Sequence, residues 1–405
     1  MSGPAFRFVH SGDFRLHETI SGLTEIPEGL RDALLDGPFA SARRVVDVAI
    51  EEEAAFVVLS GDLLNPLETS PRGLAFLIEQ FERLAERRIA VYWAGGRADP
   101  PDRWPDAIGL PDNITYFSRT RLEEVAHYVS DHHSATLLGR SSGGRARIDL
   151  TEFSRDTNDE FCIAVFNGDV DADSLAGTTI HYWALGGRPN RRTLIEQPRR
   201  IVHYCGTPQG RSPKDLDAHG CTLVQVDTQR QVHAKAIATD AVRFRVEPIF
   251  VPDRSSRSEV SRILRERARQ IAGESGERTV LVQWDVETGC RTAADLRHGP
   301  LAQEVMRDVQ PSGGAHAVWT IGIEPRIQGE LPAHWSEEDT ILGDYLRAIR
   351  EYGEDSQPLM LGEFLGSREP DGMLRDLLQI AESSERREFL REAALLGADL
   401  LRGDA

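Results

Sequence analysis

The chain has 405 residues, of which 40% are hydrophobic and 28% are charged. Because this length exceeds one ordinary core, we expect a globular protein of two or three domains. No uninterrupted apolar run is long enough to span a bilayer, and the opening segment MSGPAFRFVH lacks the basic start and apolar stretch of a signal peptide. We therefore expect a cytoplasmic protein with no membrane partner.

The charge and the cysteines disfavour several classes of function. A formal net charge of −18 repels polyanions as a whole, which argues against unaided electrostatic binding to nucleic acid. Only Lys214 and Lys235 are lysines. We favour coding bias over phosphate recognition as the explanation for the abundance of arginine. The cysteines have no CxxC pair and no histidine at zinc-finger spacing, so we expect buried free thiols. They are Cys162, Cys205, Cys221 and Cys290.

Helical and extended patterns alternate over the first part of the chain. Amphipathic helices are predicted at 41–53 and 73–88, and each precedes a short buried strand that ends in a Gly-containing loop, at 56–62 and 89–96. Such loops gather at one rim of an α/β sheet, where these proteins carry their chemistry. Further strands of this kind are predicted at 161–169, 181–187 and 201–206.

The strands predicted from 221 to 251 follow one another without helices, which indicates an antiparallel finish to a first domain, 1–250. A compact α+β pattern follows in 251–335, and it opens with an amphipathic helix at 256–275. The remaining segment, 336–405, is predicted to be helical and carries 17 acidic residues against 8 arginines. Its apolar stripes need a partner surface, either the protein's own body or another chain.

The order of the Gly-containing loops resembles the calcineurin-like metallophosphoesterases, most closely the SbcD-type DNA double-strand-break repair exonucleases. That superfamily carries D-x-H, G-D-x-x-[DN], G-N-H-[DE], an isolated His after a strand, and G-H-x-H, which hold two metal ions that clamp a phosphodiester. The corresponding segments here are SGDFRLH, SGDLLN, VYWAGGRADPPDRW, AVFNGD and HYWALGG. The resemblance covers residues 5–250 well and the rest more loosely. It implies an α/β (α+β) fold, a four-layer αββα sandwich with a small α+β cap and a helical C-terminal tail.

Carboxylates are retained at the motif positions, whereas the nitrogen ligands are missing. Asp13 begins the first motif, but the histidine position is Arg15, and Asp62 stands at the residue that bridges both metals in the superfamily. Two changes to glycine or proline, one to asparagine, one to alanine and a further one to arginine complete the degenerate pattern of this vestigial metal pocket. Its other members are Asn65, Gly96, Arg97 at the metal-binding Asn, Ala98 at the catalytic His, Asp99, Asn167 at the isolated His, and Gly187 and Pro189 at the last two histidines.

A dinuclear Mn, Fe or Zn site needs several neutral imidazoles to complete its coordination. Asp13 and Asp62, with the Asn167 carbonyl, would at most hold one weak and largely hydrated cation such as Mg²⁺. We therefore expect no metal cofactor, and no catalytic residue, because the catalytic histidine position is Ala98.

The arginines at the lost positions suggest a replacement of charge. We hypothesise that Arg15, Arg97 and Arg188 serve as counter-charges to the retained aspartates in place of the metals. The alternative is that these arginines point to solvent, and that the aspartates persist because Gly-Asp at a strand end makes turns and caps.

Two displaced histidines and a basic cluster are further candidate features. His17 and His181 lie near the pocket loops in sequence, but each is displaced from the superfamily's ligand position, so we do not expect them to rebuild a site. Residues 191–200, RRTLIEQPRR, form the densest basic cluster, for which a solvated loop is favoured over a nucleic-acid contact.

The resemblance with these losses implies a catalytically inactive pseudo-nuclease, a scaffold or a DNA- or partner-binding subunit of a DNA-processing complex. The implied partners are an SMC-like ATPase bound through the C-terminal helices, DNA, and a second copy of the chain. The alternative is an active metal-dependent phosphoesterase or DNA exonuclease with a rearranged or mononuclear site that uses Mn or Mg.

Overall fold

The computed structural model of the chain divides into two compact units. The first comprises Met1–Arg245, Arg269–Val282 and Pro311–Ile321, and the second comprises Val246–Ala268, Gln283–Gln310 and Gly322–Ala405. The boundaries of the three domains inferred from sequence stay a prediction. The structure describes residues 4–129, 131–142, 150–153, 160–171, 173–175, 178–311, 317–327, 331–354, 359–360, 379–380 and 383–402.

The first six-stranded sheet is largely parallel. Its strands are β1 (Phe6–Ser11), β2 (Phe56–Leu59), β3 (Ala90–Trp93), β4 (Ile114–Tyr116), β11 (Gly220–Val226) and β12 (Val232–Ala238). The spatial order is β12-β11-β1-β2-β3-β4. β1 to β4 are parallel, and β11 runs antiparallel to both of its neighbours, β1 and β12. The carboxyl ends of β1, β2 and β3 therefore meet at one edge.

The second six-stranded sheet repeats this plan. Its strands are β5 (Glu123–Val129), β6 (His132–Arg140), β7 (Cys162–Asn167), β8 (Tyr182–Gly186), β9 (Arg192–Gln197) and β10 (Arg200–Tyr204). The order is β5-β6-β7-β8-β10-β9, with parallel pairing from β6 through β10. β5 and β9 pair antiparallel with their neighbours at the two edges.

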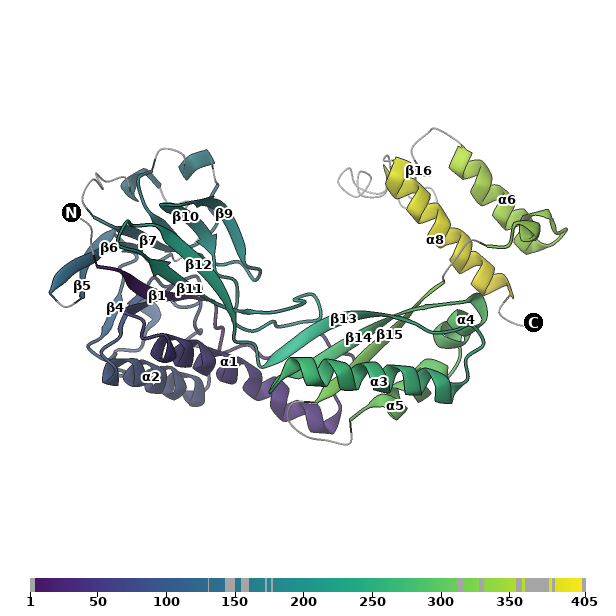
Figure 1. Cartoon of the computed structure of the whole chain (residues 1–405), viewed down its shortest axis with the longest axis horizontal. Helices are drawn as coiled ribbons and strands as arrows, with labels where there is room; N and C mark the ends of the chain where they lie inside the picture. The colour runs from purple at the N-terminus through teal and green to yellow at the C-terminus, as the bar shows by residue number, and fades with distance from the viewer. Residues whose placement is uncertain are drawn as a thin grey trace. The chain divides into compact units, whose positions relative to one another are not determined.

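The two sheets pack face to face in the first unit (Figure 1). Aromatic and branched residues such as Phe8, Phe56 and Tyr182 fill the space between them. Helices α1 (Arg31–Glu51) and α2 (Pro71–Glu86) cover the outer face of the first sheet. In the described residues, the outer face of the second sheet is covered by the short 3-10 helices η3 (Leu150–Phe153) and η4 (Asp173–Leu175). This confirms the expected calcineurin-like α/β sandwich.

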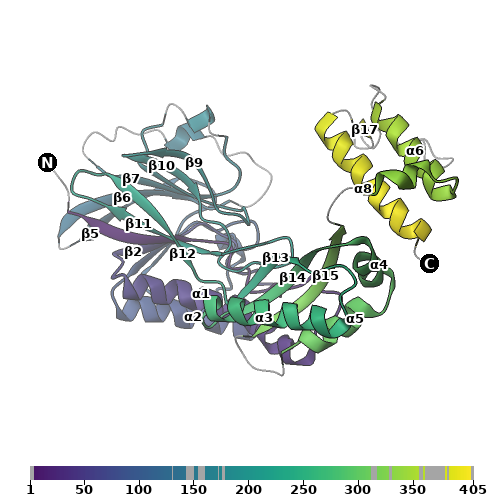
Figure 2. The ribbon, with the colours of Figure 1, turned by 45° about the vertical axis from the view of Figure 1, so that its right-hand side comes forward.

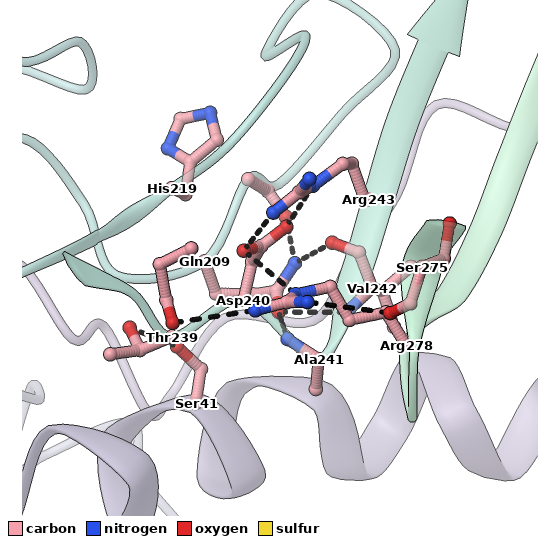
Figure 3. Close-up of polar contacts among 12 residues, drawn as sticks. Ser41, Gln209, His219, Thr239, Asp240, Ala241, Val242, Arg243, Ser275 and Arg278 are labelled. Carbon is pink, nitrogen blue, oxygen red and sulfur yellow. Dashed lines mark hydrogen bonds and ion pairs between the residues drawn. The ribbon is translucent and has the colours of Figure 1, made fainter. Parts of the chain in front are cut away.

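A buried polar cluster lies where the chain passes from β12 into β13 (Val242–Phe250). The Asp240 carboxylate accepts hydrogen bonds from Nε and Nη2 of Arg243 at 2.7 and 2.8 Å, and its Oδ1 lies 3.4 Å from Nε of Arg278. Gln209 is fully buried, and its Oε1 accepts the backbone N–H groups of the two residues after Asp240. We call Gln209, Asp240, Arg243 and Arg278 the joint cluster, and Figure 3 shows both guanidinium groups turned toward Asp240.

A three-stranded sheet has the order β13-β14-β15, with β14 at Thr279–Thr288 and β15 at Val318–Ile327. The helix predicted at 256–275 is α3 (Arg257–Ser275), and the α+β pattern predicted for this segment is confirmed. Two shorter helices, α4 (Cys290–His298) and α5 (Leu301–Val309), lie between β14 and β15 in the sequence.

The tail forms a helical hairpin in the second unit. Helices α6 (Ile341–Glu354) and α8 (Ser383–Arg402) lie side by side in both views (Figure 2). A side chain on Gly397 would clash with the ring of Tyr345, so glycine permits this close approach. Part of the tail predicted to be helical falls outside the described residues, and Gln379–Ile380 within it form strand β17 instead. No helix of the described residues is both long and apolar enough to cross a membrane.

Candidate functional site

Loops from both sheets meet at the carboxyl ends of the central parallel strands. The first sheet contributes Asp13, Asp62 and Asp99, which follow β1, β2 and β3. The second sheet contributes Asn167, which ends β7, and Gly187, which directly follows β8. The backbone N–H of Gly187 donates to Oδ2 of Asp13 at 2.7 Å, which links the two sheets. We call these five residues the carboxylate pocket, and the structure brings their loops together.

Backbone pairing fixes the first two loops of the carboxylate pocket. Three hydrogen bonds with N···O distances of 2.6 to 2.9 Å join residues 13–16 to residues 61–63. Asp13, Arg15 and Asp62 have φ values of 52°, 45° and 45°, in the left-handed region that non-glycine residues rarely occupy. Such a conformation persists only where the surroundings determine it, and the paired loops supply that constraint.

Asp99 ties the loops of the first sheet together. Its Oδ1 accepts the N–H groups of Asp62 and Gly96 at 2.9 and 2.7 Å, and its Oδ2 accepts the N–H of Leu63 at 2.7 Å. The side chain is fully buried. Burial, followed by the nearby charge of Asp62, raises the pKa of Asp99 well above its usual range, and the three N–H donors act in the opposite direction. Both of its oxygens are thus committed to the backbone.

Backbone N–H groups at the lost ligand positions bind the other two carboxylates. Asp62 Oδ1 accepts the N–H of Ala98, which stands at the catalytic histidine position, at 2.7 Å. Asp13 Oδ2 accepts the N–H of Gly187, which stands at another lost histidine. Burial raises the pKa of Asp13 from 3.8 to about 7, although the Gly187 N–H and the charge of Arg15 lower it. Asp13 Oδ1 is buried and accepts no hydrogen bond from the described residues.

The three arginines at lost positions make their contacts outside the carboxylate pocket. Nη1 of Arg15 lies 3.7 Å from Glu18, and the guanidinium of Arg188 lies 2.8 Å from Asp169. Arg97 is exposed. Among the ion pairs of the described residues, none joins these arginines to the pocket aspartates. In the described residues the expected counter-charge role is therefore not a direct ion pair, and one oxygen each of Asp13 and Asp62 accepts a backbone N–H instead.

The remaining positions of the vestigial pocket support the loops. Asn167 donates from Nδ2 to a backbone carbonyl of the loop after β2 at 2.8 Å. Asn65 donates its backbone N–H to Nδ1 of His17 at 3.0 Å. The Pro189 carbonyl accepts the N–H of Thr207 at 2.9 Å. His17 therefore caps a loop next to the pocket.

Two histidines lie buried near the carboxylate pocket, and both ring nitrogens of each are engaged. His10 contacts the hydroxyl groups of Tyr182 and Ser60 at 2.9 and 3.0 Å. His203 contacts the hydroxyl groups of Thr193 and Thr222, each at 2.9 Å. Burial lowers the pKa of both rings, to about 3 for His203, so both are neutral near pH 7. These bonds leave no ring nitrogen for a metal.

His181 likewise has a structural role, because its Nδ1 accepts the N–H of Cys162 at 3.1 Å and burial lowers its pKa to about 4. Within the described ranges, no group of three or more His, Cys, Asp or Glu side chains could hold a metal ion. Cys162, Cys205 and Cys221 are buried free thiols, as the sequence predicts.

The residues present do not fit the two metal ions that the superfamily resemblance implies. Asp13 Oδ1 is buried without a hydrogen bond in the described part of the chain, and Asp62 bonds a backbone N–H through Oδ1 alone. At most two carboxylate oxygens are therefore left, which is too few for the coordination shells of two metal ions. Gly187, at one of the histidine positions, has a φ of 91°, a conformation in which a histidine would be strained. No reaction step through a metal follows from this site.

Ser141 is a supporting residue that sequence reasoning misses. Its Oγ accepts the N–H of Gly95 at 2.8 Å and donates to the Phe117 carbonyl at 2.6 Å, which anchors the loop after β3. The Tyr116 hydroxyl donates to the Asp99 carbonyl in the same loop. Neither residue belongs to a motif, so only the fold identifies them.

The two facing sheets, with loops that meet at the carboxyl ends of their parallel strands, define the fold class: an α/β sandwich. The chain is 29% identical over 233 residues to a protein of Bacillus subtilis (strain 168) named "Uncharacterized metallophosphoesterase YhaO". This similarity supports the resemblance to the calcineurin-like metallophosphoesterase superfamily. The match covers 54% of this chain and 57% of that relative. No protein-family model matches the chain.

Proposed function

We propose that this protein is a catalytically inactive relative of the SbcD-type exonucleases, which serves as a scaffold or as a DNA- or partner-binding subunit of a cytoplasmic DNA-processing complex. The observation that carries the proposal is the bonding of the carboxylate pocket. N–H groups of Ala98 and Gly187, at two lost histidine positions, bind the carboxylates of Asp62 and Asp13. A pocket closed by its own backbone keeps the sandwich intact without the ligands that phosphodiester cleavage needs.

The exposed face of α8 supports a partner at the tail. Leu390 and Ala398 pack toward α6, whereas Phe389, Leu396 and Leu400 are exposed, with Leu400 60% accessible. Apolar residues on a second face of an amphipathic helix favour docking against another apolar surface. By the superfamily resemblance, we propose the coiled-coil base of an SMC-like ATPase as that partner. A homodimer remains a further proposal.

The alternative is an active phosphoesterase with a rearranged or mononuclear site. The observation that favours it is Asp13 Oδ1, which is buried without a hydrogen bond in the described structure. With the Asn167 carbonyl, that oxygen would suit a weakly held Mg²⁺ or Mn²⁺ rather than a transition-metal pair.

A cleavage assay separates these functions. Phosphodiester and linear duplex DNA substrates are incubated with Mn²⁺ or Mg²⁺ and with wild type, Asp62→Asn, or the surface control Asp102→Asn. The proposal predicts no cleavage above the buffer rate for any of the three. Metal-dependent cleavage that Asp62→Asn abolishes and Asp102→Asn retains would establish the enzyme instead.

Copurification tests the partner separately. An SMC-like ATPase that copurifies with the full chain, and that is lost when Leu396 and Leu400 are changed to Glu, would support docking by α8. Changing the exposed Leu67, on the loop before α2, to Glu is the matched control. Equal loss with the control would contradict a specific α8 surface.

A further inference from the structure

A cavity of about 220 Å³ lies beside the hairpin of β11 and β12. One wall is the start of β11 and the end of β12, where Gly220 pairs with Ala238 and Cys221 pairs with Ile237. The loops that follow β8 and β10 form the rest, and Arg191 lies in the first of them. None of the described residues that line this cavity belongs to the carboxylate pocket. It is therefore a separate site, which we call the hairpin cavity.

The two loops of the hairpin cavity are held against each other. Thr207 donates its backbone N–H to the carbonyl of Pro189 at 2.9 Å. Nδ1 of His219 lies 3.1 Å from both Oγ1 and the carbonyl oxygen of Thr207, and both residues are buried. Gly206 has a φ of 76°, and a β-carbon there would lie 2.7 Å from the backbone nitrogen of Arg191. The cavity is therefore preformed, as ligand sites usually are.

Small residues leave the space in the hairpin cavity. Gly220, Ala236 and Ala238 line it from the hairpin, and Ala218 lines it from the loop after β10. Leu216 also lines it and is 40% exposed, and Ala236 is exposed, so the cavity is open to solvent on their side. An apolar cavity of about 150 Å³ is large enough to bind benzene. The hairpin cavity thus has room for a body of that size with a polar group attached.

Arg191 reaches from the surface into the hairpin cavity. It is an exposed residue, yet its Nη1 donates to Oγ1 of Thr222 at 3.0 Å. Thr222 is fully buried, and its hydroxyl lies 2.9 Å from Nε2 of His203. The sequence favours a solvated loop for residues 191–200, whereas the structure forms β9 and its turn into β10 there. The arginine that precedes β9 is therefore anchored between the sheets.

The charge of Arg191 has no carboxylate beside it. The described lining of the hairpin cavity contains no Asp or Glu, and no ion pair of Arg191 is present in the described part of the chain. The bond to Thr222 is made to a neutral hydroxyl and uses one of the five N–H donors of the guanidinium. A guanidinium binds a carboxylate through two parallel N–H groups, so the remaining donors suit an anion from outside the chain.

We propose that the hairpin cavity binds a small organic acid, with its carboxylate on Arg191 and its apolar body against the small residues of the β11–β12 hairpin. This inference goes beyond the proposed function and does not depend on it. An organic acid is favoured over inorganic phosphate because the described lining offers a single guanidinium and otherwise neutral, largely apolar residues. Phosphate sites instead gather several N–H donors around the anion.

Isothermal titration calorimetry tests the proposal with three probes. They are benzoate, benzamide, which has the same shape without the charge, and inorganic phosphate. Wild type is expected to bind benzoate at least about tenfold more tightly than either of the other two, because only benzoate joins a carboxylate to an apolar ring. No binding of benzoate up to about 10 mM, equal affinity for benzamide, or tighter binding of phosphate would each overturn the proposal.

Two variants assign the binding to the hairpin cavity. Arg191→Gln is expected to weaken benzoate binding at least about tenfold and to change benzamide binding by less than about twofold. Ala236→Leu fills the cavity and retains the arginine, so it should weaken the binding of both compounds. The control is Arg192→Gln, at an exposed neighbour that does not line the cavity, and it should bind benzoate within about twofold of wild type.

Equal weakening of benzoate binding by Arg192→Gln and Arg191→Gln would contradict a specific role for Arg191. Wild-type binding in Ala236→Leu would place the ligand elsewhere and would overturn the proposal even if Arg191→Gln failed to fold. These outcomes leave the proposed function untouched, because the described residues of the carboxylate pocket do not line the hairpin cavity.

Discussion

The carboxylate pocket and the joint cluster hold buried aspartates in the same unit, and they stabilise them in different ways. In the joint cluster, Asp240 is enclosed by guanidinium groups of Arg243 and Arg278 (Figure 3). In the carboxylate pocket, Asp99 and Asp62 accept backbone N–H groups at 2.7 to 2.9 Å. Arginine is abundant around the pocket, yet it does not enter it.

The difference follows from how each cluster is built. A guanidinium carries its charge at the end of a long side chain, so it can reach and bind a carboxylate from many backbone positions. Backbone N–H groups are fixed by the fold, so they bind a carboxylate only where loops converge, as at the ends of parallel strands. A pocket that has lost its ligand side chains can thus be closed by the loops that carried them.

The largest expected effect comes from removing the carboxylate that holds three N–H groups. Asp99→Ala leaves the N–H groups of Asp62, Leu63 and Gly96 buried without an acceptor and should lower the free energy of unfolding by about 4 kcal/mol. Urea unfolding measures this. The exposed control Asp102→Ala should change it by less than about 0.5 kcal/mol. A loss below about 1 kcal/mol for Asp99→Ala would mean that the loops do not depend on these bonds.

Asp240→Ala probes the joint cluster by the same measurement. It leaves Arg243 and Arg278 without their shared carboxylate, and because both arginines are partly exposed, water recovers some of the loss. We expect a decrease of about 2 to 3 kcal/mol in the free energy of unfolding. The control Asp169→Ala, at a pair whose carboxylate is 82% exposed, should cost less than about 1 kcal/mol. A cost for Asp240→Ala no greater than for this control would remove the contrast between buried and surface pairs.

Asp13→Asn should stabilise the protein at high pH. The pKa of this carboxyl is 3.8 when unfolded and about 7 when folded, so the folded state retains a proton that the unfolded state loses. Stability therefore falls as pH rises from about 4 to about 7, and asparagine removes that fall. At pH 8 we expect a gain of about 2 kcal/mol, since a weaker bond to Gly187 offsets part of the effect. Equal pH profiles for wild type and variant would refute the burial of an ionising group.

Gly187→Ala gives the smallest expected change, a loss of about 1 kcal/mol, because the residue's φ of 91° is unfavourable for a side chain. Gly109→Ala is the control, since a β-carbon there meets nothing within 4 Å. A loss of stability for Gly109→Ala and none for Gly187→Ala would contradict this expectation. It would indicate that the loop at Gly187 relaxes freely and could accommodate a histidine.

Much of the fold could be predicted from the sequence because its signals are local. The buried runs of β2 and β3 and the periodic face of α3 reflect side-chain alternation and helical spacing within a few residues. The β9 hairpin is harder to predict from the sequence, because its exposed edge strand reads RTLIEQ and has polar residues at both ends. Edge strands carry weak patterns since one side faces solvent.

The candidate site was predicted in its positions but not in its bonding. The motifs put Asp13, Asp62, Asp99 and Asn167 in loops at strand ends, and loops after adjacent parallel strands converge at one edge of a sheet. They cannot show that N–H groups of Ala98 and Gly187 bind the carboxylates, since backbone donors leave no mark in the residue types. Residue types alone therefore favour the arginines as partners of the aspartates.

The metal content of the purified protein tests most directly the claim that backbone N–H groups have closed the carboxylate pocket. The protein is incubated with Mn²⁺, Fe²⁺ or Zn²⁺, desalted and analysed by mass spectrometry, with Asp62→Asn as the reference for adventitious binding. We predict far less than one metal ion per chain and no difference between wild type and Asp62→Asn. About two ions per chain in wild type, lost in the variant, would contradict the account.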